Sequence, residues 1–254
     1  MRQRGPRGRL AAAALLLFAA SGARAQTVDD VVRRYLQARG GAERLRNVQT
    51  LRLTGTMEIP GVPPAPFVME LKRPHLMRTE FTVEGRTGIR AYDGKAGWAQ
   101  LPLPGDPPRP MSPEDSAEAR DQADVDLSPL VDAAAKGFSI ELAGRDRIPG
   151  GETWRLVVRG AAGPPRTVHL DTKTHLAIAS EETRTVEGRP VEFVTNVGDY
   201  RTVQGLAFPF RIEVGPKGAL DRQKLVLTKV EVNPPIDDAR FKMPGTKPAD
   251  AAKD

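Results

Sequence analysis

One pattern recurs along most of this chain: short runs in which apolar and polar residues alternate, each ended by turn-forming residues. In residues 51–59, for example, Leu51, Leu53 and Met57 alternate with polar side chains. A period of two is typical of antiparallel strands that bury one face. It predicts strands over 51–59, 67–72, 76–83, 86–92, 98–103, 138–147, 153–159, 166–171, 175–186, 190–203, 206–214 and 222–232.

The segments between these runs are short and rich in turn residues, such as Asp93-Gly94 and Glu187-Gly188. Short connections make neighbours in sequence neighbours in the sheet, so the pattern indicates a meander rather than a βαβ fold. About a dozen strands in one open sheet curl strongly or fold over. We therefore predict a mainly β (α+β) protein built on a strongly curved antiparallel sheet.

Helices are predicted before the first strand. Thr27 and Asp30 have the spacing of a capping box, and apolar residues recur at helical spacing until Gly40 ends the segment. A short second helix covers residues 42–46. This pair has the pattern of elements that pack one apolar stripe against another part of the protein.

A helical insert, residues 112–137, separates two series of strands. Ser112-Pro113 and Ser128-Pro129 each have the pattern of a helix start, and Gly137 that of a stop. Residues 112–126 carry six carboxylates and one arginine, a net charge of −5. We interpret the insert as a lid over an apolar cavity. Its acidic part should face solvent or a basic rim, and its second part should dip toward the sheet.

Residues 1–25 have the features of a cleavable signal peptide: a basic start, an apolar run over 10–20 and an Ala23-Arg24-Ala25 cleavage pattern. Of the 38 basic residues, five lie in this segment, which leaves 33 against 32 acidic residues. Such a balance gives no support for nucleic-acid binding. We expect a single domain over 26–244, a disordered tail over 245–254, and a soluble periplasmic protein.

The chain has no cysteine, so disulfides, thiolate metal sites, cysteine nucleophiles and a lipid-modified cysteine are excluded. No nucleophile-elbow, zincin, P-loop or dinucleotide-binding motif occurs. His169, Asp171 and His175 could form a metal-ligand trio, although an ordinary turn between two strands explains them equally. We expect no catalytic residue, no metal and no cofactor.

The remaining signal is an apolar face rich in methionine and phenylalanine, which forms an adaptable wall suited to acyl chains. The alternative is that these residues are ordinary core. The predicted cavity-lining residues of the first strands and of the insert are Leu53, Met57, Phe67, Met69, Met77, Phe81, Leu127, Leu130, Val131 and Ala134.

Several segments together resemble a known family. They include YLQARGGAERLRNVQTLRLTGTM, KRPHLMR, AYDGKAGW, ADVDLSPLVDAAAKG, DYRTVQGLAFPF and PPIDDARFKMP. The chain resembles the bacterial outer-membrane lipoprotein-sorting proteins of the LolA/LolB-like superfamily. This resemblance implies an incomplete β-barrel with helices at its mouth, and carriage of lipoprotein acyl chains across the periplasm.

Three functional hypotheses follow. The first is a periplasmic lipid or lipoprotein carrier, a monomer with possible partner proteins at the inner and outer membranes. The second is a periplasmic interaction or envelope-sensor module with a filled core and no lipid cargo. The third is a metal-assisted hydrolase that uses His169, Asp171 and His175.

Overall fold

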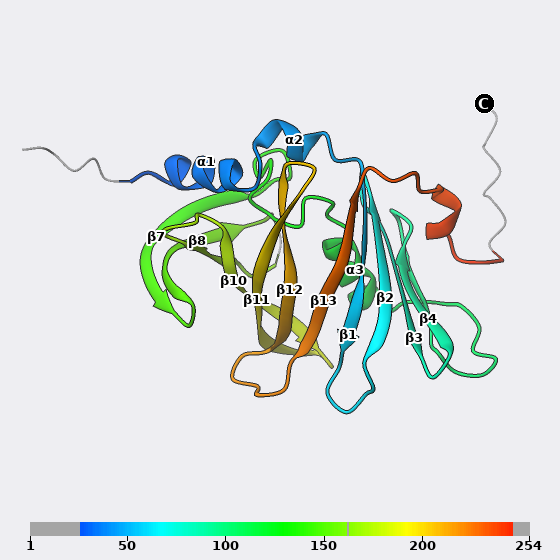
Figure 1. Cartoon of the computed structure of the whole chain (residues 1–254). Helices are drawn as coiled ribbons and strands as arrows, with labels where there is room; N and C mark the ends of the chain where they lie inside the picture. The colour runs from blue at the N-terminus through cyan, green and yellow to red at the C-terminus, as the bar shows by residue number, and fades with distance from the viewer. Residues whose placement is uncertain (1–25, 162, 246–254) are drawn as a thin grey trace, which may run out of the picture.

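The computed structural model describes residues 26–161 and 163–245, so the predicted signal peptide and nearly all of the predicted tail lie outside the described residues. Within them, thirteen antiparallel strands form one curved, unclosed sheet (Figure 1). The strands of the first arm are β1 (Thr50–Glu58), β2 (Ala65–Lys72), β3 (Leu76–Val83), β4 (Arg86–Tyr92), β5 (Gly97–Gln100) and β6 (Arg109–Pro110). Those of the second arm are β7 (Ser139–Ile148), β8 (Gly151–Arg159), β9 (Arg166–Asp171), β10 (Ala177–Val186), β11 (Arg189–Val203), β12 (Leu206–Pro216) and β13 (Gln223–Val232).

The order of the strands is β6-β5-β4-β3-β2-β1-β13-β12-β11-β10-β9-β8-β7. The predicted meander is therefore confirmed within each arm, and β1 also pairs with β13 at the centre of the sheet. This pair contains a bulge at Gly55, where a Cβ would lie 2.2 Å from the carbonyl oxygen of Val226. The two edge strands, β6 and β7, are joined by the insert.

The strand predictions needed two corrections. The predicted strand 98–103 ends at Gln100, because Pro102 and Pro104 cannot donate to a ladder. The two-residue β6 was not predicted, since its short Arg109–Pro110 pairing carries no alternation.

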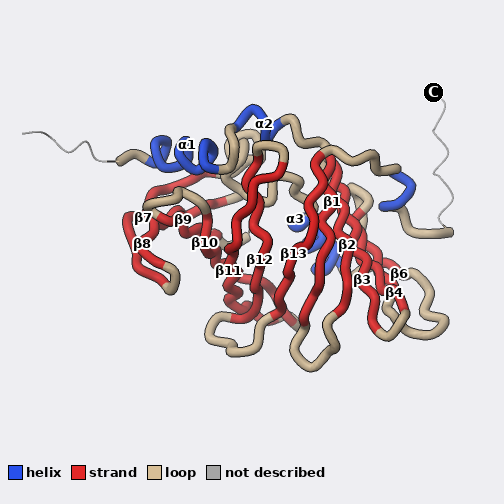
Figure 2. The backbone as a smooth tube through the Cα atoms, in the orientation of Figure 1, coloured by secondary structure: helices blue, strands red, loops and turns tan. Residues whose placement is uncertain are grey.

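In the described part of the chain, three α-helices flank the sheet: α1 (Val28–Ala38), α2 (Ala42–Arg46) and α3 (Pro113–Gln122). Figure 2 shows α1 and α2 at the upper ends of the strands and α3 behind the central strands. The capping box at Thr27 and Asp30 is present, as predicted. A 3₁₀ helix, η1 (Asp238–Phe241), lies in the segment that follows β13.

The insert is helical only in its first part. Ser112 caps α3 by accepting from the backbone N–H of Asp115, as predicted. The predicted second start is wrong: residues 129–137 form successive turns. The Ser128 hydroxyl accepts from the N–H of Leu130 only two residues on, as in a turn, and Asp132 has φ of +50°, which interrupts a helix.

Two apolar clusters fill the space between the sheet and its covering elements. The first lies under β1–β3, β12 and β13, and the second lies between α1 and strands β8 and β9. Val131 belongs to the first and Leu130 to the second, and each is 1 % exposed. Two consecutive residues of the insert thus join the two clusters, which confirms that this part of the insert packs toward the sheet.

Candidate functional site

The concave side of the sheet encloses a cavity of about 990 Å³. This volume lies at the upper end of the range of roughly 300–1,000 Å³ that is typical of ligand sites. Its wall comes from β1–β4 on one side and from β9–β13 on the other. Six predicted lining residues are part of this wall: Leu53, Met57, Phe67, Met69, Phe81 and Leu127.

The position of Phe81 shows how a small residue shapes the wall. Phe81 on β3 pairs with Gly88 on β4, and a Cβ at Gly88 would lie 2.4 Å from the Phe81 ring. The missing side chain therefore leaves room for the ring over β4. On the other side Phe81 pairs with Phe67 of β2, so two aromatic side chains lie next to each other on the cavity wall.

Four predicted lining residues lie elsewhere. Met77 is fully buried in the first apolar cluster, at the start of β3, and residues of the insert belong to the same cluster. Leu130 and Val131 are core residues for the reason given above. Ala134 is exposed and borders a separate outer groove together with residues of α1. The turns that replace the predicted helix direct the side chains of Leu130, Val131 and Ala134 away from the cavity.

The opposite wall was not predicted. The only sequence signal for this wall was the period-two spacing along β12 and β13. It places Ile212 and Val214 on one face of β12, and Leu225 and Leu227 on one face of β13. Nothing in the sequence indicated that these faces turn toward Met57 and Phe67. The apolar residues of this wall are Val168, Ala177, Ala179, Val197, Phe208, Ile212, Val214, Leu225 and Leu227.

A buried arginine reaches the cavity from the C-terminus of α1. The Arg39 guanidinium donates to the carbonyl of Ala207 (2.9 Å), to the Tyr35 hydroxyl (2.8 Å) and to the carbonyl of Asp126 (3.2 Å). Its charge also lies 6.0 Å from the ring centroid of Phe208. Arg39 thereby connects α1, β12 and the insert. Nearby, burial raises the pKa of the Tyr200 phenol well above its ordinary value.

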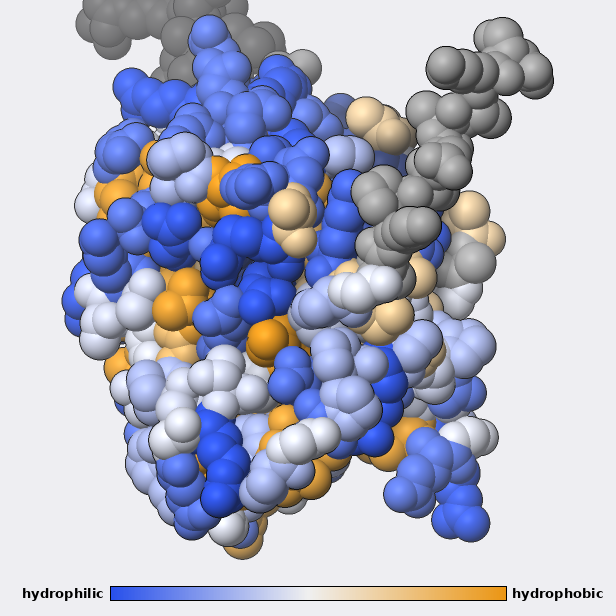
Figure 3. Space-filling model, turned by 90° about the vertical axis from the view of Figure 1, so that its right-hand side faces the viewer, coloured by the Kyte–Doolittle hydropathy of each residue, from blue (hydrophilic) through white to orange (hydrophobic). Residues whose placement is uncertain are grey.

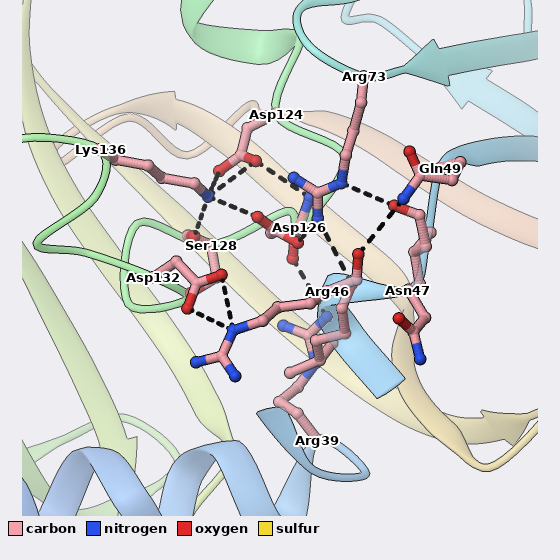
Figure 4. A network of polar contacts seen from close by, with 12 residues as sticks. Arg39, Arg46, Asn47, Gln49, Arg73, Asp124, Asp126, Ser128, Asp132 and Lys136 are labelled. Atoms are coloured by element: carbon pink, nitrogen blue, oxygen red, sulfur yellow. Dashed lines mark hydrogen bonds and ion pairs between the residues drawn. The ribbon is translucent and has the colours of Figure 1, made fainter. Parts of the chain in front are cut away.

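Figure 4 shows a second polar cluster, which fixes the turn region of the insert. The buried carboxylate of Asp126 pairs with Arg73 (Nη2 to Oδ1, 2.5 Å) and with Lys136 (Nζ to Oδ2, 2.7 Å). Lys136 also pairs with Asp124 at 2.7 Å. Burial raises the pKa of Asp124, although the neighbouring Lys136 acts in the opposite direction. These contacts tie the insert to the loop between β2 and β3.

The acidic residues of α3 meet arginines of both arms. The Glu118 carboxylate lies 3.1 Å from Arg90 of β4 and 3.1 Å from Arg184 of β10. One turn further along, Asp121 pairs with Arg166 of β9. The basic rim that we predicted for the acidic part of the insert is therefore present. The sequence identified the acidic partners but gave no signal for which arginines they meet.

The possible metal-ligand trio of His169, Asp171 and His175 does not converge. His169 is buried, its Nδ1 lies 3.3 Å from the Thr153 hydroxyl, and burial lowers its pKa. Asp171 instead accepts backbone N–H groups of its own turn, from Lys173 and Thr174. Across residues 26–161 and 163–245, no group of three potential ligands is arranged to hold a metal ion.

The end of the first arm is mainly hydrophilic on its outside. In Figure 3, apolar side chains appear on this face as small separate patches between polar ones. The described helices include none that combines the length and the apolar character needed to cross a membrane.

Among the comparisons with known proteins, only the comparison of structures gave matches. A scan against protein-family models gave no match, and neither did a sequence search of curated proteins. The structure itself, one open and curved antiparallel sheet with few helices, is similar in fold to a solved protein of the LolA superfamily.

Three solved structures illustrate this likeness. A LolA superfamily protein from Nitrosomonas europaea, NE2245, is 12% identical with a TM-score of 0.55, over 85% of this chain and 97% of that one. A domain assigned to an outer membrane lipoprotein-sorting protein from Vibrio parahaemolyticus is 9% identical with a TM-score of 0.54, over 84% and 94%. A DUF1329 family protein from Desulfovibrio piger is 12% identical with a TM-score of 0.56, over 85% and 98%.

Proposed function

We propose that this protein is a periplasmic carrier that binds the acyl chains of lipids or lipoproteins reversibly in the cavity and catalyses no covalent step. The observation that carries the proposal is the apolar cavity of about 990 Å³ on the concave side of the sheet. Its lining by Met57, Met69, Phe67 and Phe81 suits flexible hydrocarbon chains. The fold shared with a lipoprotein-sorting protein domain supports the same function.

The energetics of chain burial are sufficient for this function. Each methylene that leaves water contributes about 0.8 kcal/mol, so a chain of roughly a dozen methylenes gains on the order of 10 kcal/mol before the cost of ordering it. Release then requires an acceptor or a change in the cavity rather than chemistry. The volume of the cavity also favours the carrier over a sensor module with a packed interior.

The periplasmic location is part of the proposal and rests on the signal-peptide pattern of residues 1–25. Partner proteins at the inner and outer membranes would supply and accept the cargo. We expect a monomer, because a carrier of this kind needs only its own cavity.

Mass spectrometry of lipids extracted from protein purified without detergent tests the proposal. We expect lipid in a near-stoichiometric amount. Val197→Trp, which places a large ring in the cavity, should reduce it strongly. Val226→Trp is the matched control, because Val226 is 40 % exposed on β13 and does not line the cavity. An empty wild-type protein, or equal lipid in all three proteins, would contradict the proposal.

A further inference from the structure

The charges that line the cavity are unequal. Six basic side chains take part in the wall against three carboxylates, although most of the wall is apolar. A cation next to an apolar surface is costly to leave without an anionic partner. The basic residues are Arg39, Arg90, Arg120, Lys136, Arg166 and Arg184, and the carboxylates are Glu118, Asp121 and Asp124.

Three of the basic residues lie on strands and pair with carboxylates of α3, and a fourth, Arg120, lies on α3 itself. We call these four the arginine belt: Arg90, Arg120, Arg166 and Arg184. Six strands separate β4, which carries Arg90, from β10, which carries Arg184, in the order of the sheet. The Glu118 carboxylate nevertheless contacts both guanidinium groups, each at 3.1 Å and through a different oxygen. One carboxylate thus occupies the space between two cations from opposite walls of the cavity.

The belt has more positive than negative charge. Its anionic partners are Glu118, Asp121 and Glu182, and the last of these bonds Arg166 and Arg184 together. Arg120 forms no ion pair with any residue in the described part of the chain. Four guanidinium groups against three carboxylates leave one positive charge, which one further monoanion would neutralise.

The contacts of Glu118 are accessible to solvent. Its side chain is 36% exposed, and those of Arg90 and Arg184 are 30% and 26% exposed, so solvent reaches all three groups. A carboxylate or phosphate from a ligand would make the same charge-assisted hydrogen bonds as Glu118 does. A neutral polar end would not compensate these cations.

We propose that the cavity selects amphiphiles whose polar end is an anion, a carboxylate or a phosphate ester, and that this end binds Arg90 and Arg184 in place of Glu118. This inference rests on the proposed function, because the apolar chain of the same ligand occupies the cavity. Arg120 supplies the additional positive charge that favours the exchange.

Calorimetric titration of the delipidated protein at low ionic strength tests the inference. The ligands are oleate, oleyl alcohol and an oleoyl lysophosphatidate, with acetate and inorganic phosphate as anions without a chain. We expect oleate and the lysophosphatidate to bind at least tenfold more tightly than the alcohol. Equal binding of oleate and oleyl alcohol overturns the inference and leaves the proposed function intact. Absence of binding by all three chains contradicts both, and binding of the free anions as tight as that of oleate overturns the selectivity for amphiphiles.

Two variants separate binding from folding. Glu118→Gln removes the carboxylate shared by both arginines and should strengthen oleate binding at least threefold, an increase that a weakened fold cannot produce. Arg90→Gln combined with Arg184→Gln should reduce oleate binding to the level of the alcohol. Arg211→Gln is the control, because it removes a similar Arg–Glu pair that does not line the cavity. Weaker oleate binding by Glu118→Gln would mean that the belt only holds α3.

Discussion

Replacing Leu130 by alanine tests whether the insert joins the two apolar clusters. Leu130 is 1 % exposed and packs in the second cluster with Tyr35, Leu156 and Leu170. Truncation of a leucine in such a site removes buried hydrocarbon and leaves a cavity, at a cost of about 3 kcal/mol. For a protein of this size the corresponding decrease in Tm is roughly 6–12 °C.

The measurement is urea unfolding followed by circular dichroism, together with a thermal scan. Leu220→Ala is the matched control, because Leu220 is 99 % exposed in the loop between β12 and β13 and should change the free energy of unfolding by less than about 0.5 kcal/mol. Equal unfolding midpoints for the two variants would refute the packing that we assign to the insert. Leu130→Asp should be more damaging still, since it buries an unpaired charge.

Three further predictions concern buried groups outside the cavity wall. Asp126→Asn leaves Arg73 without its carboxylate and should lower the free energy of unfolding by about 3 kcal/mol, as measured in urea; a change close to zero would show that the pair adds nothing. Phe241→Ala, at a fully buried position, should cost about 4 kcal/mol in the same assay, and an unchanged midpoint would mean that η1 does not support the sheet. Burial lowers the pKa of His169, so the folded state resists protonation and the free energy of unfolding should fall as the pH drops below about 6.5. Between about pH 7.5 and pH 5.5 the Tm of His169→Gln should therefore fall less than the Tm of the wild type. Equal decreases in Tm would contradict this role of His169.

Local patterns predicted the strands well, because each strand has its own alternation. The segments 76–83, 86–92 and 166–171 coincide with β3, β4 and β9. The second part of the insert failed because Ser128-Pro129 resembles a helix start, while the positive φ of Asp132 is set by the surrounding contacts. Tertiary structure overrides local preference at such positions.

The cavity was predictable only in part. The face formed by Met57, Phe67 and Phe81 could be recognised because methionine and phenylalanine stand out at alternate positions. The opposite wall needs the pairing of β1 with β13, which no local signal contains. For the same reason nothing in the sequence connected Glu118 with Arg90 or Arg184, whose side chains meet only when the sheet curls.

The pairing of β1 with β13 has a consequence for how the chain acquires its structure. Leu51 pairs with Val232, so the centre of the sheet joins residues that are far apart in sequence. Contacts of such long range form slowly, since the chain between them must first be ordered. When the protein is made from its N-terminus, one side of β1 stays unpaired until residues 223–232 arrive. The two arms can each begin to form earlier, but the concave surface between them exists only after the last strand is in place.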